Sequence, residues 1–199
     1  MNGYKEFQQL LKQDFYGTMK HFKGKKKVSM KETAGKINRI TARMKFVKKF
    51  QEVKVKQYSK ETMSGYNGIF QTFLAYSAFE GFIQLFPEVD KNEVEKGFPK
   101  KKYKQVSKKI LQLDKGNKFL DSLQQQVTNH TLKNRIIAFQ KGEKTTPLVI
   151  AKSIRHIFAH GKLTPNANDA NPEKVAEICS LLSNLMLEIM DKELSLIHI

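Results

Sequence analysis

The 199-residue sequence contains no tryptophan and a single cysteine, Cys179. One thiol excludes a disulfide framework within the chain, so we expect a reducing, cytoplasmic setting. The neighbours of Cys179 are the apolar Ile178, Leu181 and Leu182, which predicts a small buried side chain rather than a reactive one. Because the chain has 14 Phe residues, we expect phenylalanine to fill much of the core.

Long apolar runs are also scarce. The most hydrophobic segment, residues 69–86, is interrupted by Gln71, Glu80 and Gln84, which indicates a buried helix rather than a membrane span. The first residues lack the apolar stretch of a secretory signal, so we expect no such signal and no membrane association. Strand signals are rare, and the sequence shows neither an internal repeat nor a glycine-rich phosphate loop.

Acidic residues are few, since 36 Lys and Arg stand against 19 Asp and Glu and give a formal net charge of +17. Residues 1–60 hold 17 of the basic residues and four of the acidic ones. Such a charge implies an anionic partner, which is RNA, DNA or an acidic membrane face. Aromatic residues are interleaved with these cations, which makes RNA contact at least as good an interpretation as a solvated face. The RNA-binding candidates in this region are Lys25, Lys26, Lys27, Lys48 and Lys49.

Apolar residues recur at helical spacing along most of the chain, which predicts an all-α protein. Residues 1–59 form a basic N-terminal region that we expect to be helical, with a short strand as the alternative for VKVKQY (53–58). Residues 60–193 are predicted to form an antiparallel helical bundle. The last six residues, LSLIHI (194–199), read like the in-frame translation of a sequencing adapter, and we expect them to be an adapter-derived tail.

The central helix of the predicted bundle begins at Ser59 and ends before Pro87, because proline cannot continue a helix. Its apolar residues cover nearly the whole circumference, which places it in the middle of the bundle. Pro147 and Gly161 mark the start and the end of a second apolar helix. The remaining helices are expected over residues 105–113, 118–127, 132–139 and 172–193, after a basic linker at 97–104.

The segment SIRHIFAHG (153–161) combines an arginine, two histidines and a glycine with apolar residues. On a helical wheel of about 100° per residue, Lys152, Arg155, His156 and His160 lie opposite the apolar stripe. Arg155 and His160 are about 140° apart, so two helices packed about a two-fold axis would bring both residue types to one cleft. His160 lies in the last turn, where the helix dipole favours the imidazolium form. Cations near a helix C-terminus are common, so spacing alone leaves surface decoration as the alternative.

RHIFAHG (155–161) resembles the signature of the HEPN superfamily, an arginine followed by several apolar positions and a histidine. FLAYSAFEGF (73–82) resembles an early core helix of several HEPN families, and the likeness covers roughly residues 60–193. The resemblance implies a helical bundle that pairs with a second copy and acts as a metal-independent ribonuclease in toxin or antiviral defence systems. It also implies that Arg155 and His160 are the catalytic pair and that an antitoxin protein is a candidate partner.

The chemistry of these residue types suits RNA cleavage. The 2′-OH is a nucleophile built into RNA, and its attack needs a base, an acid for the leaving oxygen and a cation for the phosphorane. Histidine suits both proton steps near neutral pH, each worth about 10²–10⁴-fold. A guanidinium binds phosphate oxygens in a bidentate manner. Lys152 and Lys162 flank the motif as further phosphate contacts, and no cofactor is required.

Other interpretations of these residues are weaker or structural. His156 and His160 have the i, i+4 spacing of a zinc pair, but no glutamate lies between them and no third ligand is evident, so we predict no metal site. His156 is expected to contact phosphate or solvent. Glu80 is expected to form a salt bridge to a neighbouring helix, with the alternative that it orients Arg155 or His160.

Two functions therefore remain for the chain. The first is a homodimeric, metal-independent endoribonuclease of HEPN type, with the basic N-terminal region holding the RNA backbone. The alternative is a non-catalytic helical protein that binds nucleic acid or acts as an adaptor. Some HEPN toxins carry a tyrosine two residues after the motif histidine. Lys162 occupies that position here, so the modification mechanism of those toxins is not implied.

Overall fold

A computed structural model describes residues 9, 30–84, 100–143 and 145–196. These residues form seven α-helices and one 3-10 helix and contain no strand, so the prediction of an all-α protein is confirmed. In chain order the helices are α3 (Met30–Lys49), α4 (Lys60–Ile83), α6 (Lys100–Leu113), α7 (Lys118–Gln126), α8 (His130–Gln140), α9 (Leu148–Ala159), η1 (Ala167–Asp169) and α10 (Pro172–Leu196). No helix among the described residues is both long and apolar enough to span a bilayer.

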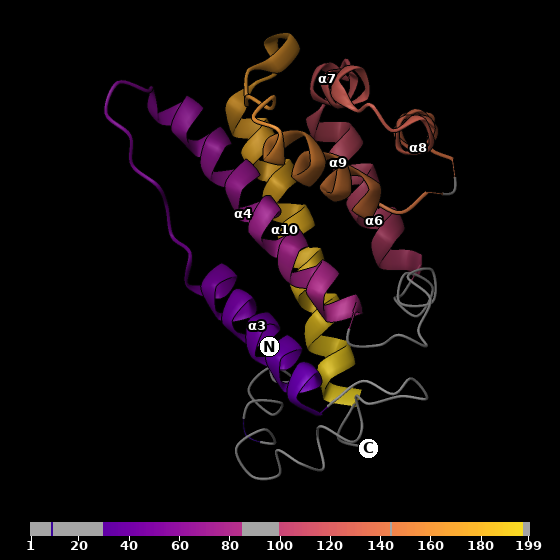
Figure 1. Cartoon of the computed structure of the whole chain (residues 1–199). Helices are drawn as coiled ribbons and strands as arrows, with labels where there is room; N and C mark the ends of the chain where they lie inside the picture. Colours follow the sequence, from indigo (N-terminus) through magenta and orange to yellow (C-terminus); the bar gives the residue numbers. More distant parts are fainter. Residues whose placement is uncertain (1–8, 10–29, 85–99, 144, 197–199) are drawn as a thin grey trace.

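Helix α4 lies at the centre, as its apolar circumference predicts. It packs most extensively on α10 and also contacts α3 and α9. In Figure 1, α4 and α10 run side by side, with α3 on one flank and α6, α7 and α8 on the other. The predicted start is confirmed, because the Ser59 side chain accepts a hydrogen bond from the Thr62 N–H and caps the helix. The predicted end near Pro87 lies outside the described residues.

Two glycines allow the close approach of α4 and α10. A Cβ atom at Gly68 would lie 2.8 Å from the Ala176 Cα atom of α10. One at Gly65 would overlap the ring of Pro165, which precedes α10, and would lie 3.1 Å from the Pro172 Cβ atom at the start of α10. Below these glycines the Thr72 hydroxyl donates a buried hydrogen bond of 3.1 Å to the carbonyl of Cys179. The two long helices are therefore joined by close packing at the glycines and by a buried hydrogen bond.

Helix α3 packs along α4 through three buried residues at helical spacing, Ile40, Met44 and Val47. The Arg43 guanidinium donates a hydrogen bond of 3.2 Å to the carbonyl of Ser77 on α4. The structure confirms a helix in the basic N-terminal region, and this helix ends at Lys49. Of the first 29 residues, only Gln9 is described.

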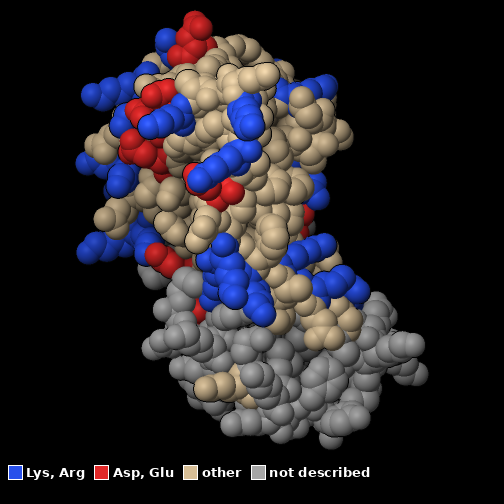
Figure 2. All heavy atoms as spheres, turned by 90° about the vertical axis from the view of Figure 1, so that its left-hand side faces the viewer, with Lys and Arg blue, Asp and Glu red and all other residues tan. Residues whose placement is uncertain are grey.

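An extended segment of residues 50–59, here called the strap, joins α3 to α4. The alternative of a short strand at 53–58 is wrong, because no strand forms there and an isolated extended segment has no partner strand to pair with. The strap runs along the outer side of α4 in Figure 1. Figure 2 views the molecule from that side and shows Lys and Arg side chains at many points of a surface made mostly of other residues, with fewer Asp and Glu.

The second half of the chain supports α9. The linker predicted at 97–104 is wrong in part, since α6 begins at Lys100. Tyr103 is buried with Val106 and Ile110, and their spacing of three and four residues extends the apolar face of the helix through the basic run. The buried Asp114 accepts hydrogen bonds from the N–H groups of Phe119 and Leu120 and thereby caps α7.

Isoleucine and leucine are the commonest residues of the described core, so phenylalanine fills less of it than the composition predicts. The buried phenylalanines are Phe79, Phe82, Phe119 and Phe139. Cys179 is also fully buried, and burial raises the pKa of its thiol to about 12. The prediction of a structural rather than a reactive cysteine is thus confirmed. Helix α10 continues to Leu196, three residues into the segment predicted to be a tail.

Candidate functional site

Helix α9 separates an apolar face from a polar one, as its wheel predicts. The buried face consists of Leu148, Val149, Ile150, Ala151, Ser153, Ile154 and Ile157. Lys152 and His160 are exposed, and Arg155 and His156 are partly buried. The four predicted basic side chains therefore lie at the surface.

The end of α9 is fixed by a glycine. Gly161 has a φ of +69°, which is in the left-handed region that a residue with a Cβ atom seldom adopts. The Gly161 N–H donates to the Phe158 carbonyl at 2.9 Å, and the Lys162 N–H donates to the Ile157 carbonyl at 3.2 Å. These two bonds form a Schellman motif, with His160 as the C-cap. The prediction that Gly161 ends the helix is confirmed.

Arg155 is held by the central helix. A guanidinium nitrogen of Arg155 lies 3.0 Å from a carboxylate oxygen of Glu80 on α4. The two side chains are 39% and 28% exposed, so solvent reaches the pair. The salt bridge expected for Glu80 is present, and its partner is the arginine of the motif.

The two histidines of the motif form a pair. The ring centroids of His156 and His160 are 4.9 Å apart and the ring planes are inclined by 77°. Partial burial lowers the pKa of His156, and the positive charges of His160, Arg155, Lys152 and Lys162 lower it further. A neutral His156 imidazole is therefore favoured near neutral pH, because protonation would add a charge to a cluster that is already cationic.

An aromatic cluster links the motif to the strap. Phe158, between the two histidines in sequence, packs edge-on against Phe70 and Phe73 of α4, with centroid distances of 6.2 and 5.5 Å. Phe50, the first residue of the strap, packs edge-on against Phe70 at 5.3 Å. The sequence prediction did not include this connection, although the helical spacing of Phe70 and Phe73 could have indicated an aromatic face.

The candidate RNA-binding lysines have different environments. Lys152 and Lys162 are exposed beside the motif, and Lys49 is exposed at the end of α3. Lys48 is only 16% exposed and its ammonium lies 4.0 Å from the carboxylate of Asp191 on α10. Its position favours a role in joining α3 to α10 rather than in binding phosphate. The other three candidates, Lys25, Lys26 and Lys27, lie outside the described residues.

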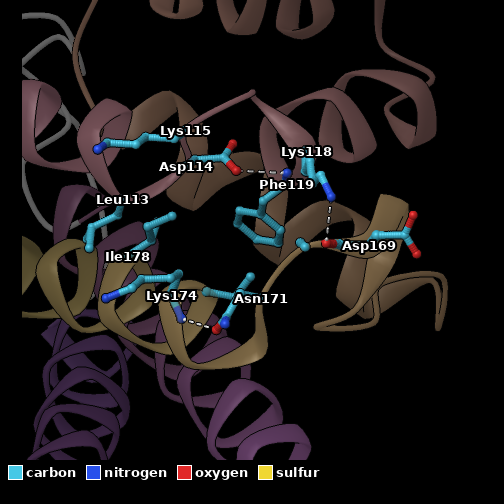
Figure 3. Close-up of a pocket in the computed structure, with 11 residues that line it drawn as sticks. Leu113, Asp114, Lys115, Lys118, Phe119, Asp169, Asn171, Lys174 and Ile178 are labelled. Carbon is cyan, nitrogen blue, oxygen red and sulfur yellow. Dashed lines mark hydrogen bonds between the residues drawn. The ribbon is translucent and has the colours of Figure 1, made fainter.

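The described residues contain no group of three or more His, Cys, Asp or Glu side chains placed to hold a metal ion. A small cavity of about 210 Å³ lies away from α9, between the turn after α6, the start of α7 and the start of α10 (Figure 3). Phe119 and Ile178 line its apolar wall, and the Lys118 ammonium donates to the Asp169 carbonyl at 3.4 Å. No residue of the motif lines this cavity.

Comparison with protein-family models, curated proteins and solved structures finds no match for this chain. The described residues form an all-α protein with a cationic helix end at its surface. The HEPN resemblance depends on the motif at 155–161 and on the helix that carries it.

Proposed function

We propose that this chain is a metal-independent endoribonuclease of HEPN type that cuts RNA in a cleft between two copies. The observation that carries the proposal is the polar end of α9. It presents one guanidinium and two contacting imidazoles at the surface, within a cluster of five basic residues. Such a cluster attracts a phosphodiester and can also move protons, which a purely electrostatic patch cannot do.

The proposed reaction uses both copies of His160. One imidazole takes the proton of the 2′-OH, and the 2′ oxygen forms a bond to phosphorus. The bond from phosphorus to the 5′ oxygen breaks, and the His160 imidazolium of the second copy donates a proton to that oxygen. The products are a 2′,3′-cyclic phosphate and a 5′-OH, so no water, metal or cofactor is consumed.

Arg155 is proposed to hold the phosphate and to stabilise the negative charge of the phosphorane. Its pair with Glu80 occupies part of the guanidinium, and an arginine has five N–H donors in all. Glu80 is therefore proposed as a positioning residue that keeps Arg155 directed along α9. His156 shares the cluster with His160 and supports phosphate binding.

The biological setting is proposed from the family resemblance. HEPN ribonucleases act as toxins or in antiviral defence, and the proposal places this chain in the cytoplasm in such a role. A toxin needs a partner that restrains it, so an antitoxin protein is part of the proposal. A homodimer is required because a single α9 carries one His160 and the reaction uses two.

A non-catalytic role is the second candidate, and one observation favours it. The ion pair of Arg155 and Glu80 joins α9 to α4, which is also what a bracing residue would do. In this case the chain binds nucleic acid through its positive surface and does not cleave it.

Purified protein incubated with RNA in excess EDTA separates the two candidates. We expect cleavage by the wild type and a loss of about 10²–10⁴-fold in Arg155→Ala and His160→Ala, with RNA affinity and helical content retained. His130→Ala is the matched control, because His130 is an exposed histidine on α8 and its removal should leave cleavage unchanged. Absence of cleavage by the wild type would support the binding role, and equal cleavage by all variants would rule out Arg155 and His160 as the catalytic pair.

A further inference from the structure

The strap is attached to α4 at defined points. The Val53 N–H donates to the Asn67 side-chain oxygen at 2.7 Å, and the Asn67 amide donates to the Val53 carbonyl at 3.2 Å. One side chain thus pairs with both backbone groups of a strap residue, as a neighbouring strand would. Phe50 anchors the other end of this stretch against Phe70. The strap is therefore held in an extended form on the surface.

The exposed surface of the strap is unusually apolar. Four large hydrophobic side chains are exposed in the described part of the chain, and all lie between residues 46 and 58. They are Phe46, 56% exposed, Val53, 43%, Val55, 48%, and Tyr58, 54%. Scattered exposed hydrophobic residues are normal in proteins, but a group confined to one short segment indicates a binding surface.

Lysines alternate with these apolar residues. Lys54 and Lys56 alternate in sequence with Val53 and Val55, and all four residues are exposed. Lys45, Lys49 and Lys60 are exposed at its two ends. Glu52, the one acidic residue of the strap, forms an ion pair of 2.9 Å with Lys54, which leaves the strap and its ends with a clear excess of positive charge.

Tyr58 is an aromatic ring fixed at the surface. Its ring centroid lies 5.7 Å from that of Tyr66 on α4, with the planes inclined by 59°, while more than half of the residue stays exposed. The preceding residue, Gln57, has a φ of +90°, a conformation that is strained for a residue with a Cβ atom and is often retained at functional sites. The turn therefore presents Tyr58 beside α4.

The strap and the motif share one aromatic cluster. Phe50 contacts Phe70, Phe70 contacts Phe158, and Phe158 lies between His156 and His160 on α9. The strap therefore begins next to the residues that seat the end of α9.

We propose that the strap is a binding surface for single-stranded RNA, an inference that rests on the proposed function and supplies its substrate class. A single strand offers phosphates to the lysines and unpaired bases to Tyr58 and the valines. A duplex hides its base faces and would leave the apolar side chains unused. A second copy of this chain would bring the same lysines against one another, so charge complementarity favours RNA over a second copy as the partner of the strap.

Binding to fluorescein-labelled 12-nucleotide oligouridine, measured by anisotropy, tests the proposal. The background is His160→Ala, so the RNA stays intact. We expect Tyr58→Ala to weaken binding about 5- to 100-fold and Tyr58→Phe to retain it. Affinity for a labelled RNA duplex should be unaffected by Tyr58→Ala, because paired bases cannot stack on the ring.

The lysines are tested by salt dependence. Lys54→Gln combined with Lys56→Gln should lower the slope of log affinity against log salt by about 1.4, because each phosphate contact of a single strand contributes about 0.7. Lys108→Gln combined with Lys109→Gln is the matched control, since both lysines are exposed on α6. It should leave the slope and the affinity close to those of the parent.

The outcomes separate the strap from the nuclease. Unchanged oligouridine binding in both strap variants overturns the strap proposal, whether or not the wild type cleaves RNA. No binding by the parent protein overturns it as well. An altered sedimentation coefficient with unchanged RNA affinity overturns it in favour of a second copy. If the strap variants lose oligouridine binding and the wild type cleaves no RNA, the strap proposal is supported and the nuclease proposal is rejected.

Discussion

Replacing Glu80 by glutamine tests how α4 presents Arg155. The change preserves the size of the side chain and removes its charge, so the ion pair at 3.0 Å is lost. Both side chains are partly exposed, at 39% for Arg155 and 28% for Glu80, and water therefore screens the pair. Exposed pairs contribute about 0–1 kcal/mol, so we expect the free energy of unfolding to fall by no more than about 1 kcal/mol.

The effect of Glu80→Gln on cleavage should be larger than its effect on stability. A guanidinium without its partner is displaced from the phosphate, and small displacements of this kind lower rates by about 10- to 100-fold. Single-turnover cleavage of labelled RNA in EDTA measures the rate, and urea unfolding followed by circular dichroism measures stability. Glu177→Gln is the control, because it removes an exposed ion pair of 2.7 Å with Lys174 on α10 and should leave cleavage unchanged.

Two results would refute this reasoning. A loss of more than about 3 kcal/mol is the signature of a broken buried pair and would contradict the screened environment of Glu80. Full cleavage by Glu80→Gln, at normal stability, would show that Glu80 has no part in positioning Arg155. In that case the pair does nothing beyond joining α9 to α4.

Three further predictions concern stability, each measured by urea unfolding. Gly68→Ala should cost about 1–3 kcal/mol through overpacking against α10, and an unchanged urea midpoint would contradict the close packing. Gly161→Ala should lower the free energy of unfolding by about 1–2 kcal/mol, because the φ of Gly161 is +69°. Gly142→Ala, at a φ of +71° on another turn, should lower it by a similar amount. The pKa of His156 is lowered from 6.5 in the folded chain, so the unfolded chain binds more protons and the free energy of unfolding should fall as the pH drops below about 6.5. His156→Gln should reduce this fall. The same pH dependence of stability in the variant and the wild type would contradict the lowered pKa.

The helix end that carries the motif could be predicted closely from the sequence. Pro147 and Gly161 act locally, because one lacks a backbone donor and the other tolerates a positive φ. The polar side of α9 followed from its 3.6-residue period alone. These features need no information about the rest of the chain.

The features that depend on tertiary contacts were predicted less well. Lys48 belongs to a basic run, yet it packs beside Asp191 of a helix more than 140 residues away, and no local pattern indicates that pairing. Helix α6 begins within the segment predicted as a basic linker, because Tyr103 reaches the core. The alternation of VKVKQY suggested a strand, but the backbone of Val53 pairs with the side chain of Asn67 and not with a neighbouring strand.

The central claim is that the end of α9 cleaves RNA through the 2′-OH. The most direct measurement is single-turnover cleavage, in excess EDTA, of an RNA and of the same strand with 2′-deoxy nucleotides at the cleaved positions. The account predicts that the wild type cuts the RNA and spares the deoxy strand, while His160→Ala cuts neither. Equal cleavage of both strands, or cleavage by His160→Ala at the rate of the wild type, would contradict it.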